Sequence, residues 1–287
     1  MEFKQYLASR YSESTVRNYL CDIKGYAAFV VDIEEASYHQ VMDYIGYLRS
    51  RESKRVYAIL SAIKSYYHYL IAIGKRNDHP ADAIRLRHRR GASIQLQDLF
   101  TREELAKLLE KVEYHPHLKH RNKVMMSLLV YQGLSKGEIM RLQVDDIDLA
   151  SASVYVQGSV RSNARRLKLE ANQLYWLVQY LREDRPKLIS EATDQLILNK
   201  YGKAGIGNEI RNLMRYGREL FCDKHLTAQL IRQSVIHNLL KEGKDLRLVQ
   251  AFAGHKNPST TEKYRQTGIE ELKSEVLKKH PLGGSLD

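Results

Sequence analysis

Residues 226–232 of this 287-residue chain read LTAQLIR, residues 246–255 read LRLVQAFAGH, and residues 259–264 read STTEKY. Helical apolar patterning from Ala228 to Leu240 places Arg232 on a helix. His255 follows Arg232 by 23 positions, and Tyr264 follows His255 by nine. Each of these residue types is common alone. The three together, in this order and at these separations, form a specific combination.

The composition is that of a folded, basic protein. Apolar residues make up 43% of the chain, enough for roughly two domains with real cores. Lys plus Arg number 46 and Asp plus Glu 34, so the net charge of +12 favours a polyanionic partner, either nucleic acid or an acidic membrane surface. No apolar stretch approaches the roughly 18 residues that span a bilayer, and the first residues lack the pattern of a signal peptide. We therefore expect a cytoplasmic protein.

The amino-terminal part predicts a small, all-helical domain over residues 1–76. Apolar side chains recur there at three- and four-residue steps, which is the helical period. Four helices are expected, near residues 3–7, 16–30, 38–48 and 56–70. Gly74 is a candidate stop for the last of them. Tyr66 and Tyr69 lie off the apolar stripe, so they either contact a DNA backbone or, as the favoured interpretation, pack partly buried against the domain.

Residues 77–98 predict a basic linker, because the helical patterning fails and arginines accumulate. Its basic residues, together with those just before it, are the candidate DNA contacts: Lys75, Arg76, Arg85, Arg87, Arg89 and Arg90. A basic tether between two basic domains suits a clamp around DNA. A solvated connector is the alternative interpretation.

Residues 99–287 predict a second domain that is mainly α with a small sheet. Thr101 and Glu104 form a capping box that opens its first helix. Two short strands are expected at Val154–Val156 and Leu167–Leu169, around a basic turn at Gly158–Asn163. Further helices are expected near residues 123–131, 136–142, 172–181, 209–220 and 228–240.

Motifs for nucleotide-driven or metal-driven chemistry are missing from the sequence. It contains no GxxxxGK[ST], no GxGxxG after a strand and no HExxH. Cys21 and Cys222 form no CxxC pair, so neither a disulfide framework nor a zinc knuckle is indicated. We therefore expect a function that uses no cofactor and no metal.

The three carboxyl-terminal segments resemble the tyrosine recombinases, the phage-integrase and Xer-like family. That family carries a T-x-H-x-x-R helix, an L-x-x-[VI]-Q-x-x-x-G-H turn, and a T-x-x-Y nucleophile nine residues after the GH. Residues 133–138, GLSKGE, are similar to its G-L-R-x-x-E segment, and the predicted hairpin occupies the place of its catalytic-lysine hairpin. The amino-terminal helices and basic linker resemble its core-binding, SAM-like domain and hinge, so the resemblance covers most of the chain.

The resemblance implies a site-specific DNA recombinase or integrase, of the kind found in mobile elements, that acts through a covalent 3′-phosphotyrosyl intermediate at Tyr264. Phosphodiester exchange without a metal needs a nucleophile, cations on the non-bridging oxygens, and a proton donor for the departing 5′-hydroxyl. Arg232 offers a planar fork to the phosphate, and His255 a hydrogen-bond donor. Gln229 lies one turn before Arg232 on the same helix face.

Three positions depart from the family pattern. Ser135 stands where the first arginine belongs, Gln229 stands where the histidine before Arg232 belongs, and the hairpin turn has no lysine. Arg161, or less favourably Arg165, substitutes for that lysine, unless these residues only contact phosphates. Loss of one charged donor costs about 2.7–4 kcal/mol of transition-state stabilisation, which slows a reaction without abolishing it.

Family members form a C-shaped clamp around duplex DNA, and the resemblance implies four protomers on two duplexes. Inverted-repeat half-sites and accessory DNA-bending proteins are the further expected partners. The tail from Ile269 to Lys279 has apolar residues that suit docking either on a neighbouring protomer or on its own domain. The alternative function, motivated by Ser135 and Gln229, is a catalytically weakened relative that binds DNA as an architectural or regulatory protein. A lipid surface is disfavoured, because no helix pairs a strong apolar face with a lysine-rich one.

Overall fold

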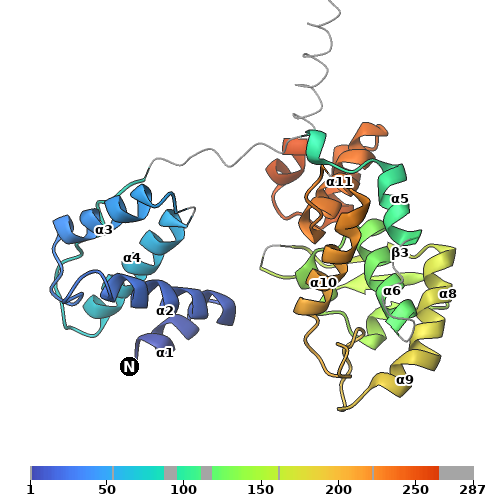
Figure 1. The fold of residues 1–287 in the computed structure, drawn as a ribbon, viewed down its shortest axis with the longest axis horizontal. Coiled ribbons are helices and arrows are strands. Elements are labelled where there is room, and N and C mark those ends of the chain that lie inside the picture. The colour runs from blue at the N-terminus through green and yellow to red at the C-terminus, as the bar shows by residue number, and fades with distance from the viewer. Residues whose placement is uncertain are drawn as a thin grey trace, which may run out of the picture. The chain divides into compact units, whose positions relative to one another are not determined.

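The computed structural model describes residues 2–53, 55–86, 96–110, 118–160, 162–221 and 223–264. The chain divides into two compact units, Met1–Gly91 and Ala92–Asp287, and the division falls inside the predicted linker. The first unit is helical, and the second is mainly helical with a small sheet (Figure 1). The predicted fold class is confirmed.

The first unit contains the four expected helices. They are α1 (Phe3–Ala8), α2 (Glu13–Ala27), α3 (Tyr38–Ser50) and α4 (Val56–Ala72). Ser37 begins α3 with a capping box, because its hydroxyl accepts from the backbone N–H of Gln40 while the Gln40 side chain accepts from the N–H of Ser37. In the core, the buried hydroxyls of Tyr26 and Tyr67 lie 2.8 Å apart, and Tyr67 also donates to the carbonyl of Ile33 at 3.0 Å. These two fully buried tyrosines are therefore hydrogen-bonded, which offsets the cost of burying their hydroxyls.

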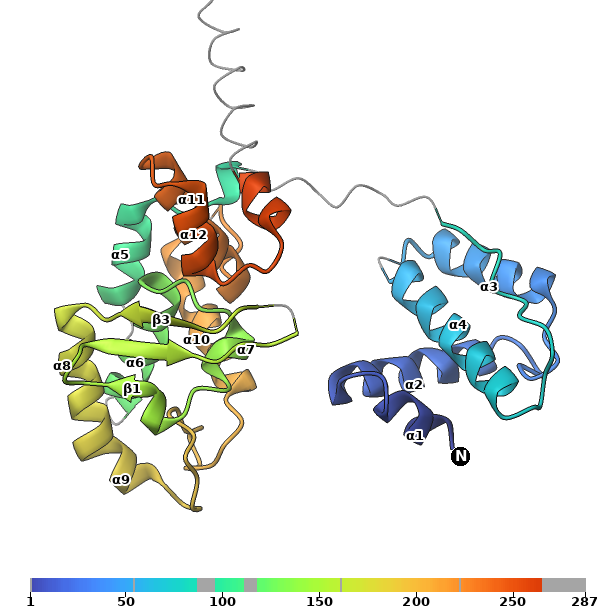
Figure 2. The same ribbon diagram turned by 180° about the vertical axis from the view of Figure 1, so that it is seen from behind.

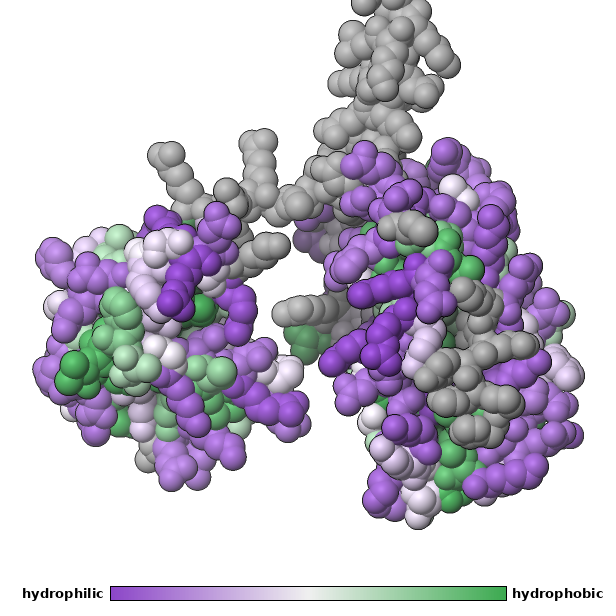
Figure 3. Space-filling view, in the orientation of Figure 1, coloured by the Kyte–Doolittle hydropathy of each residue, from purple (hydrophilic) through white to green (hydrophobic). Residues whose placement is uncertain are grey.

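Tyr66 and Tyr69 pack within this unit, as the favoured interpretation predicts. Tyr66 is 8% exposed, and both rings contact Phe3 with centroid separations of 5.2 Å. Apolar side chains do reach the surface elsewhere on the unit, where they gather on one side (Figure 3). The large exposed apolar residues of this unit are Tyr11, Phe29, Val31, Tyr38, Tyr47 and Ile71.

Part of the predicted linker belongs structurally to the first unit. Gly74 ends α4 with φ of +72°, a left-handed conformation that favours glycine. Beyond it, Ala81 and Ile84 are buried in the same core, and the Lys64 ammonium donates to the carbonyls of Asp82 and Ile84 at 3.0 Å. Ala81 and Ile84 stand among charged residues and show no helical or strand periodicity, so the sequence did not indicate that they pack in this core.

The second unit contains a three-stranded antiparallel sheet in the order β1–β2–β3. The predicted hairpin is formed by β2 (Ser153–Val156) and β3 (Arg165–Lys168), with Val154 opposite Leu167. A further strand, β1 (Ile147–Asp148), pairs with β2 and was not predicted, since two residues are too short to show an alternating pattern. Figure 2 shows the sheet as one layer in front of α6 (Lys119–Val130).

Helix α6 runs through the core of the second unit, and every residue from Arg121 to Val130 is buried. The surrounding helices are α5 (Arg102–Glu110), α7 (Lys136–Ile139), α8 (Ala171–Gln179), α9 (Arg185–Leu188), α10 (Gly207–Gly217), α11 (Ala228–Lys241) and α12 (Leu246–Ala253), and residues 258–264 are also helical. The capping box of Thr101 and Glu104 is present. The helix expected to end near 181 instead continues through a π-helical turn, Tyr180–Asp184, into α9, whose first turn accepts Pro186.

Candidate active site

Helix α11 positions Arg232. Its N-cap is Thr227, whose hydroxyl accepts from the backbone N–H of Leu230 at 3.0 Å. Ile231 and Val235 are buried in the core of the second unit, and they fix the rotation of the helix. The Arg232 side chain therefore projects toward α7 and α12 and remains only 13% exposed.

Helix α12 and the glycine after it position His255. Asp245 caps the helix by accepting from the N–H groups of Arg247 and Leu248, and Val249 is buried beneath it. Gly254 ends the helix with φ of +70°, a conformation that a side chain would strain. The backbone N–H of His255 then donates to Gln250, at the end of the helix. The motif LRLVQAFAGH is thus a capped helix with a glycine stop that presents a histidine.

Arg232 is held by three acceptors. Its Nη1 donates to the carbonyl of Gly133 at 2.7 Å and to the carboxylate of Glu138 at 3.1 Å. Its Nη2 donates to the carbonyl of Ala253, at the end of α12. The guanidinium therefore joins α11, α12 and the start of α7, and its plane is fixed before any ligand binds.

Glu138 and Arg165 complete this cluster, and sequence reasoning gave Glu138 no role. The Arg165 Nη1 donates to Glu138 Oε1 at 2.7 Å, while Glu138 Oε2 accepts from Arg232 and from the backbone N–H of Ser135. The Arg165 Nε donates to the carbonyl of Phe252 at 2.6 Å. The carboxylate is only 3% exposed. The sequence signal for Glu138 was its place at the end of the GLSKGE segment, which does not reveal partners 27 and 94 residues away.

The charge balance of the cluster is one carboxylate against two guanidinium groups. Burial alone would raise the pKa of Glu138, but the hydrogen bond from Arg165 and the charges of both arginines outweigh burial and hold that pKa below 4.5. Glu138 is therefore ionised at neutral pH. The cluster carries a net charge of about +1, which equals the charge needed to neutralise one phosphodiester.

His255 lies beside this cluster as a neutral imidazole. Burial lowers the pKa of His255 from 6.5 to about 4, and the positive charges of Arg232 and Arg165 act in the same direction. Its Nδ1 lies 2.8 Å from the hydroxyl of Thr261, in the helical segment that carries Tyr264. When Thr261 donates to Nδ1, the ring carries its proton on Nε2, which can then donate to an anion.

We expect His255 to remain neutral down to about pH 5, well below the range in which an ordinary histidine titrates. Carbon-labelled histidine NMR gives the midpoint, and His255→Gln identifies the resonance. Replacing Arg232 with Gln should raise the midpoint, because a nearby positive charge is removed. Arg166→Gln removes an exposed arginine from β3, so it is the matched control and should leave the midpoint unchanged. A midpoint near 6.5 in the wild-type protein would contradict the buried, cationic environment.

Tyr264 packs against α11 and α12. It is 8% exposed and contacts a small apolar cluster with Ile236, Val249 and Ala253. Burial raises the pKa of Tyr264, while the charge of Arg232 and a hydrogen bond from Gln233 act against that rise. The phenol is therefore protonated at neutral pH, and Arg232 is the group that stabilises its ionised form. The structure brings together Arg232, His255 and Tyr264.

Ser135 is used as a helix cap. Its hydroxyl accepts from the N–H of Glu138 at 3.2 Å, and its own N–H donates to the Glu138 carboxylate at 2.8 Å. Lys136, the next residue, lies at the surface with its side chain beside Gly207 at the start of α10. Neither residue supplies a cation to the Arg232 cluster.

Of the two other predicted catalytic residues, the structure describes only Gln229, and it lies outside the cluster. Gln229 is exposed on the first turn of α11, and the hydrogen bonds found around Arg232 do not involve it. Arg161 lies outside the described residues. The turn around it ends against the His255 loop, since the N–H of Asn163 donates to the carbonyl of Gly254 at 2.8 Å.

The predicted DNA contacts that the structure describes are partly used within the first unit. Lys75 pairs with Glu34 at 2.9 Å. Arg76 donates to Asp78 at 2.7 Å and to the carbonyl of Glu34, and its side chain is 12% exposed. Arg85 is exposed and donates to the carbonyl of Asp82. Arg87, Arg89 and Arg90 lie outside the described residues.

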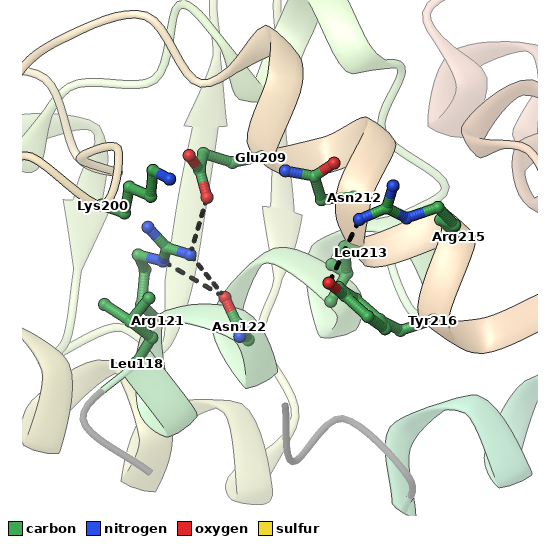
Figure 4. Close-up of a pocket in the computed structure, with 9 residues that line it drawn as sticks. All are labelled: Leu118, Arg121, Asn122, Lys200, Glu209, Asn212, Leu213, Arg215 and Tyr216. Carbon is green, nitrogen blue, oxygen red and sulfur yellow. Dashed lines mark hydrogen bonds and ion pairs between the residues drawn. The ribbon is translucent and has the colours of Figure 1, made fainter. Parts of the chain in front are cut away.

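A separate cavity of about 250 Å³ lies between the first turn of α6 and one flank of α10 (Figure 4). Arg121, at its base, pairs with Glu209 at 3.1 Å and donates to Asn122. Lys200 and Arg215 contribute further positive charge to its lining.

No cluster of metal-binding side chains occurs among the described residues. None of their helices has the length and apolar character to cross a membrane.

Comparison with known protein families shows to which family this chain belongs. The phage integrase family matches residues 98–270, and its amino-terminal SAM-like domain matches residues 1–74. The chain belongs to the phage integrase family.

Similar proteins include the tyrosine recombinase XerD of Staphylococcus epidermidis, 28% identical with 94% of this chain and 93% of that protein covered. The tyrosine recombinase XerC of Lacticaseibacillus casei is 25% identical, with 97% of each chain covered. A lambda integrase tetramer bound to a Holliday junction has a similar fold, with a TM-score of 0.68, 17% identity, and 91% of this chain and 74% of that chain covered.

Proposed function

We propose that this protein is a site-specific DNA recombinase that cleaves and rejoins strands through a covalent 3′-phosphotyrosyl intermediate at Tyr264. Family membership and the similarity to tyrosine recombinases support recombination as the reaction. The observation that carries the assignment of residues is the cluster in which Arg232 is bonded to Glu138 and its charge acts on both Tyr264 and His255.

The proposed step balances without a cofactor. The Tyr264 Oη attacks the scissile phosphorus, a P–Oη bond forms, and the P–O5′ bond breaks. The phenol loses its proton, and the departing 5′-oxygen gains one. Negative charge grows on the non-bridging oxygens in the transition state, and the fixed guanidinium of Arg232 and the N–H of neutral His255 stabilise it. Rejoining is the reverse, with a 5′-hydroxyl attacking the phosphotyrosine.

Burial of Tyr264 has a consequence for this step. The Tyr264 ring is 8% exposed and packs against Ile236, Val249 and Ala253, so helical residues 258–264 must shift when DNA binds for its hydroxyl to attack a phosphate. Thr261 is fully buried, and its hydroxyl links this segment to His255. DNA binding and exposure of the nucleophile are therefore coupled in the proposed mechanism.

The test uses a DNA substrate that the protein itself selects. Repeated binding selection from random duplexes gives the preferred sequence, and inverted half-sites of about a dozen base pairs are expected. A nicked version of this duplex lets the cleaved end diffuse away, and it should trap a protein–DNA adduct that survives denaturant. DNA binding without any adduct, with accessory DNA-bending proteins supplied, would favour the architectural or regulatory alternative, which the missing cation at Ser135 motivates.

We propose that the partners are duplex DNA and three further copies of the chain. The lambda integrase of similar fold forms a tetramer on a Holliday junction, and XerH of similar fold is bound to a palindromic substrate. The tail Ile269–Lys279 lies outside the described residues, and its docking on a neighbouring protomer or on its own domain stays a prediction. Integration, excision, inversion and dimer resolution are all compatible with the same chemistry.

DNA affinity should fall steeply with salt, because each phosphate neutralised contributes about −0.9 to the slope of log affinity against log salt. Replacing Arg87, Arg89 and Arg90 together with Ala should make this slope less steep by about 2.7 if all three contact phosphates. Fluorescence anisotropy at several salt concentrations measures both slopes. An unchanged slope in the triple variant would assign these residues to a solvated connector.

A further inference from the structure

Arg165 shares a carboxylate with Arg232. The two Nη1 atoms lie 2.7 Å and 3.1 Å from opposite oxygens of Glu138, so the two guanidinium groups are held on either side of one carboxylate. The side chain of Arg165 is only 6% exposed, which is less than that of Arg232. A buried cation of this kind needs more than one hydrogen bond to offset its desolvation.

One nitrogen of Arg165 has no acceptor. Nε donates to the carbonyl of Phe252 and Nη1 donates to Glu138, but Nη2 is buried without a hydrogen-bond partner among the described residues. Such groups are rare in native proteins, because an unpaired buried donor is destabilising. A donor that is left unpaired beside the candidate active site is suited to an anionic ligand.

The Arg165 guanidinium lies close to the backbone just before His255. Gly254 precedes His255, and a Cβ at this position would lie 2.5 Å from the Arg165 Nη1. Only glycine leaves room for the guanidinium at this distance. The charge of Arg165 also acts on His255, in the same direction as the charge of Arg232.

We propose that Arg165 is a second guanidinium that binds the scissile phosphate beside Arg232, with its unpaired Nη2 as the donor once DNA binding uncovers it. This rests on the proposed function. The phosphodiester carries one negative charge and gains a second in the transition state. Arg232 and Arg165, offset by one Glu138, have a net charge of about +1 that neutralises the first, and their N–H donors stabilise the second by hydrogen bonding. Arg165 supplies charge and a hydrogen bond here, and it does not transfer a proton.

The test compares two substrates. One is the nicked duplex with its natural phosphodiester, and the other carries a neutral methylphosphonate at the scissile position. Arg165→Ala should slow adduct formation by about 10²–10³-fold on the phosphodiester, by analogy with other removed oxyanion donors. On the methylphosphonate, which lacks the charge that Arg165 balances, the variant should stay within about tenfold of wild type. DNA affinity should change little on either substrate.

Arg166→Ala is the matched control. Arg166 is the next residue of β3, has a side chain that is 59% exposed, and donates to Ser153 on the outer face of the sheet. Its replacement should leave both rates unchanged. If Arg165→Ala does not fold, as judged by Trp176 fluorescence, Arg165→Lys provides the measurement. Lysine keeps the positive charge but lacks the planar guanidinium, so we expect a smaller decrease in the rate of adduct formation, confined to the phosphodiester substrate.

The outcomes separate this inference from the proposed function. Equal loss on the two substrates would give Arg165 a structural role and overturn the inference, as would a wild-type rate in Arg165→Ala. In both of these cases the wild-type adduct, and with it the proposed function, would stand. Failure of the wild-type protein to form any adduct on DNA that it binds would overturn both.

Discussion

Tyr264→Phe should abolish the covalent protein–DNA adduct while leaving DNA affinity nearly unchanged. The substitution removes only the hydroxyl, which is the attacking atom in the proposed mechanism, and the loss of a nucleophile of this kind reduces turnover by on the order of 10⁴-fold or more. The ring keeps its contacts with Ile236, Val249 and Ala253, so the fold should be retained. A denaturing gel of the nicked duplex incubated with protein measures the adduct.

Tyr155→Phe is the control for this experiment. Tyr155 lies on β2 and is 38% exposed, so removal of its hydroxyl alters the surface without touching the cluster. It should form adduct at the wild-type rate. Protease digestion of the wild-type adduct should further give a DNA-linked peptide that contains Tyr264. An adduct that persists in Tyr264→Phe would assign the nucleophile to another residue.

Glu138→Gln should destabilise the second unit by about 3–5 kcal/mol. This is the range for removing one partner of a buried ion pair, because the remaining charge is left uncompensated. Here two guanidinium groups are left, one from Arg165 and one from Arg232, and both have largely buried side chains. Urea unfolding followed by the fluorescence of Trp176, the single tryptophan, reports on this unit.

The pH dependence of the free energy of unfolding supplies a second test of the role of Glu138. The pKa of Glu138 is held below its ordinary value of 4.5 in the folded protein. The stabilisation it provides is therefore fully present above the unfolded pKa and is lost as the pH falls through the folded pKa. Glu138→Gln removes this contribution, so the variant should lose less stability on acidification below about pH 4.5 than the wild-type protein.

Glu104→Gln is the matched control for stability. Glu104 also closes a capping box, with Thr101, and it pairs with a single cation, Lys224, at 2.6 Å. Its side chain is 25% exposed, so water screens the pair and the cost should be about 1 kcal/mol or less. If the two substitutions lowered the free energy of unfolding equally, the buried pairing of Glu138 with two guanidinium groups would stabilise the fold no more than the partly exposed pair of Glu104 and Lys224.

Local sequence patterns determined most of the helices and the chemistry-bearing residues. Helical periods, the capping box at Thr101 and the glycine stop at Gly74 depend on neighbours within about four residues, so they are readable from the chain alone. The order of Arg232, His255 and Tyr264 is likewise a property of the sequence. It identified the family before any contact was known.

Tertiary structure alone decided how these residues are paired. The partners of Glu138 lie 27 and 94 positions away, and no local pattern encodes that one carboxylate joins β3 to α11. The same holds for the burial of Tyr264, which depends on packing between α11 and α12, and for the unpaired donor of Arg165. Charge balance and burial are sums over contacts distant in sequence, and for this physical reason they became visible only in the folded chain.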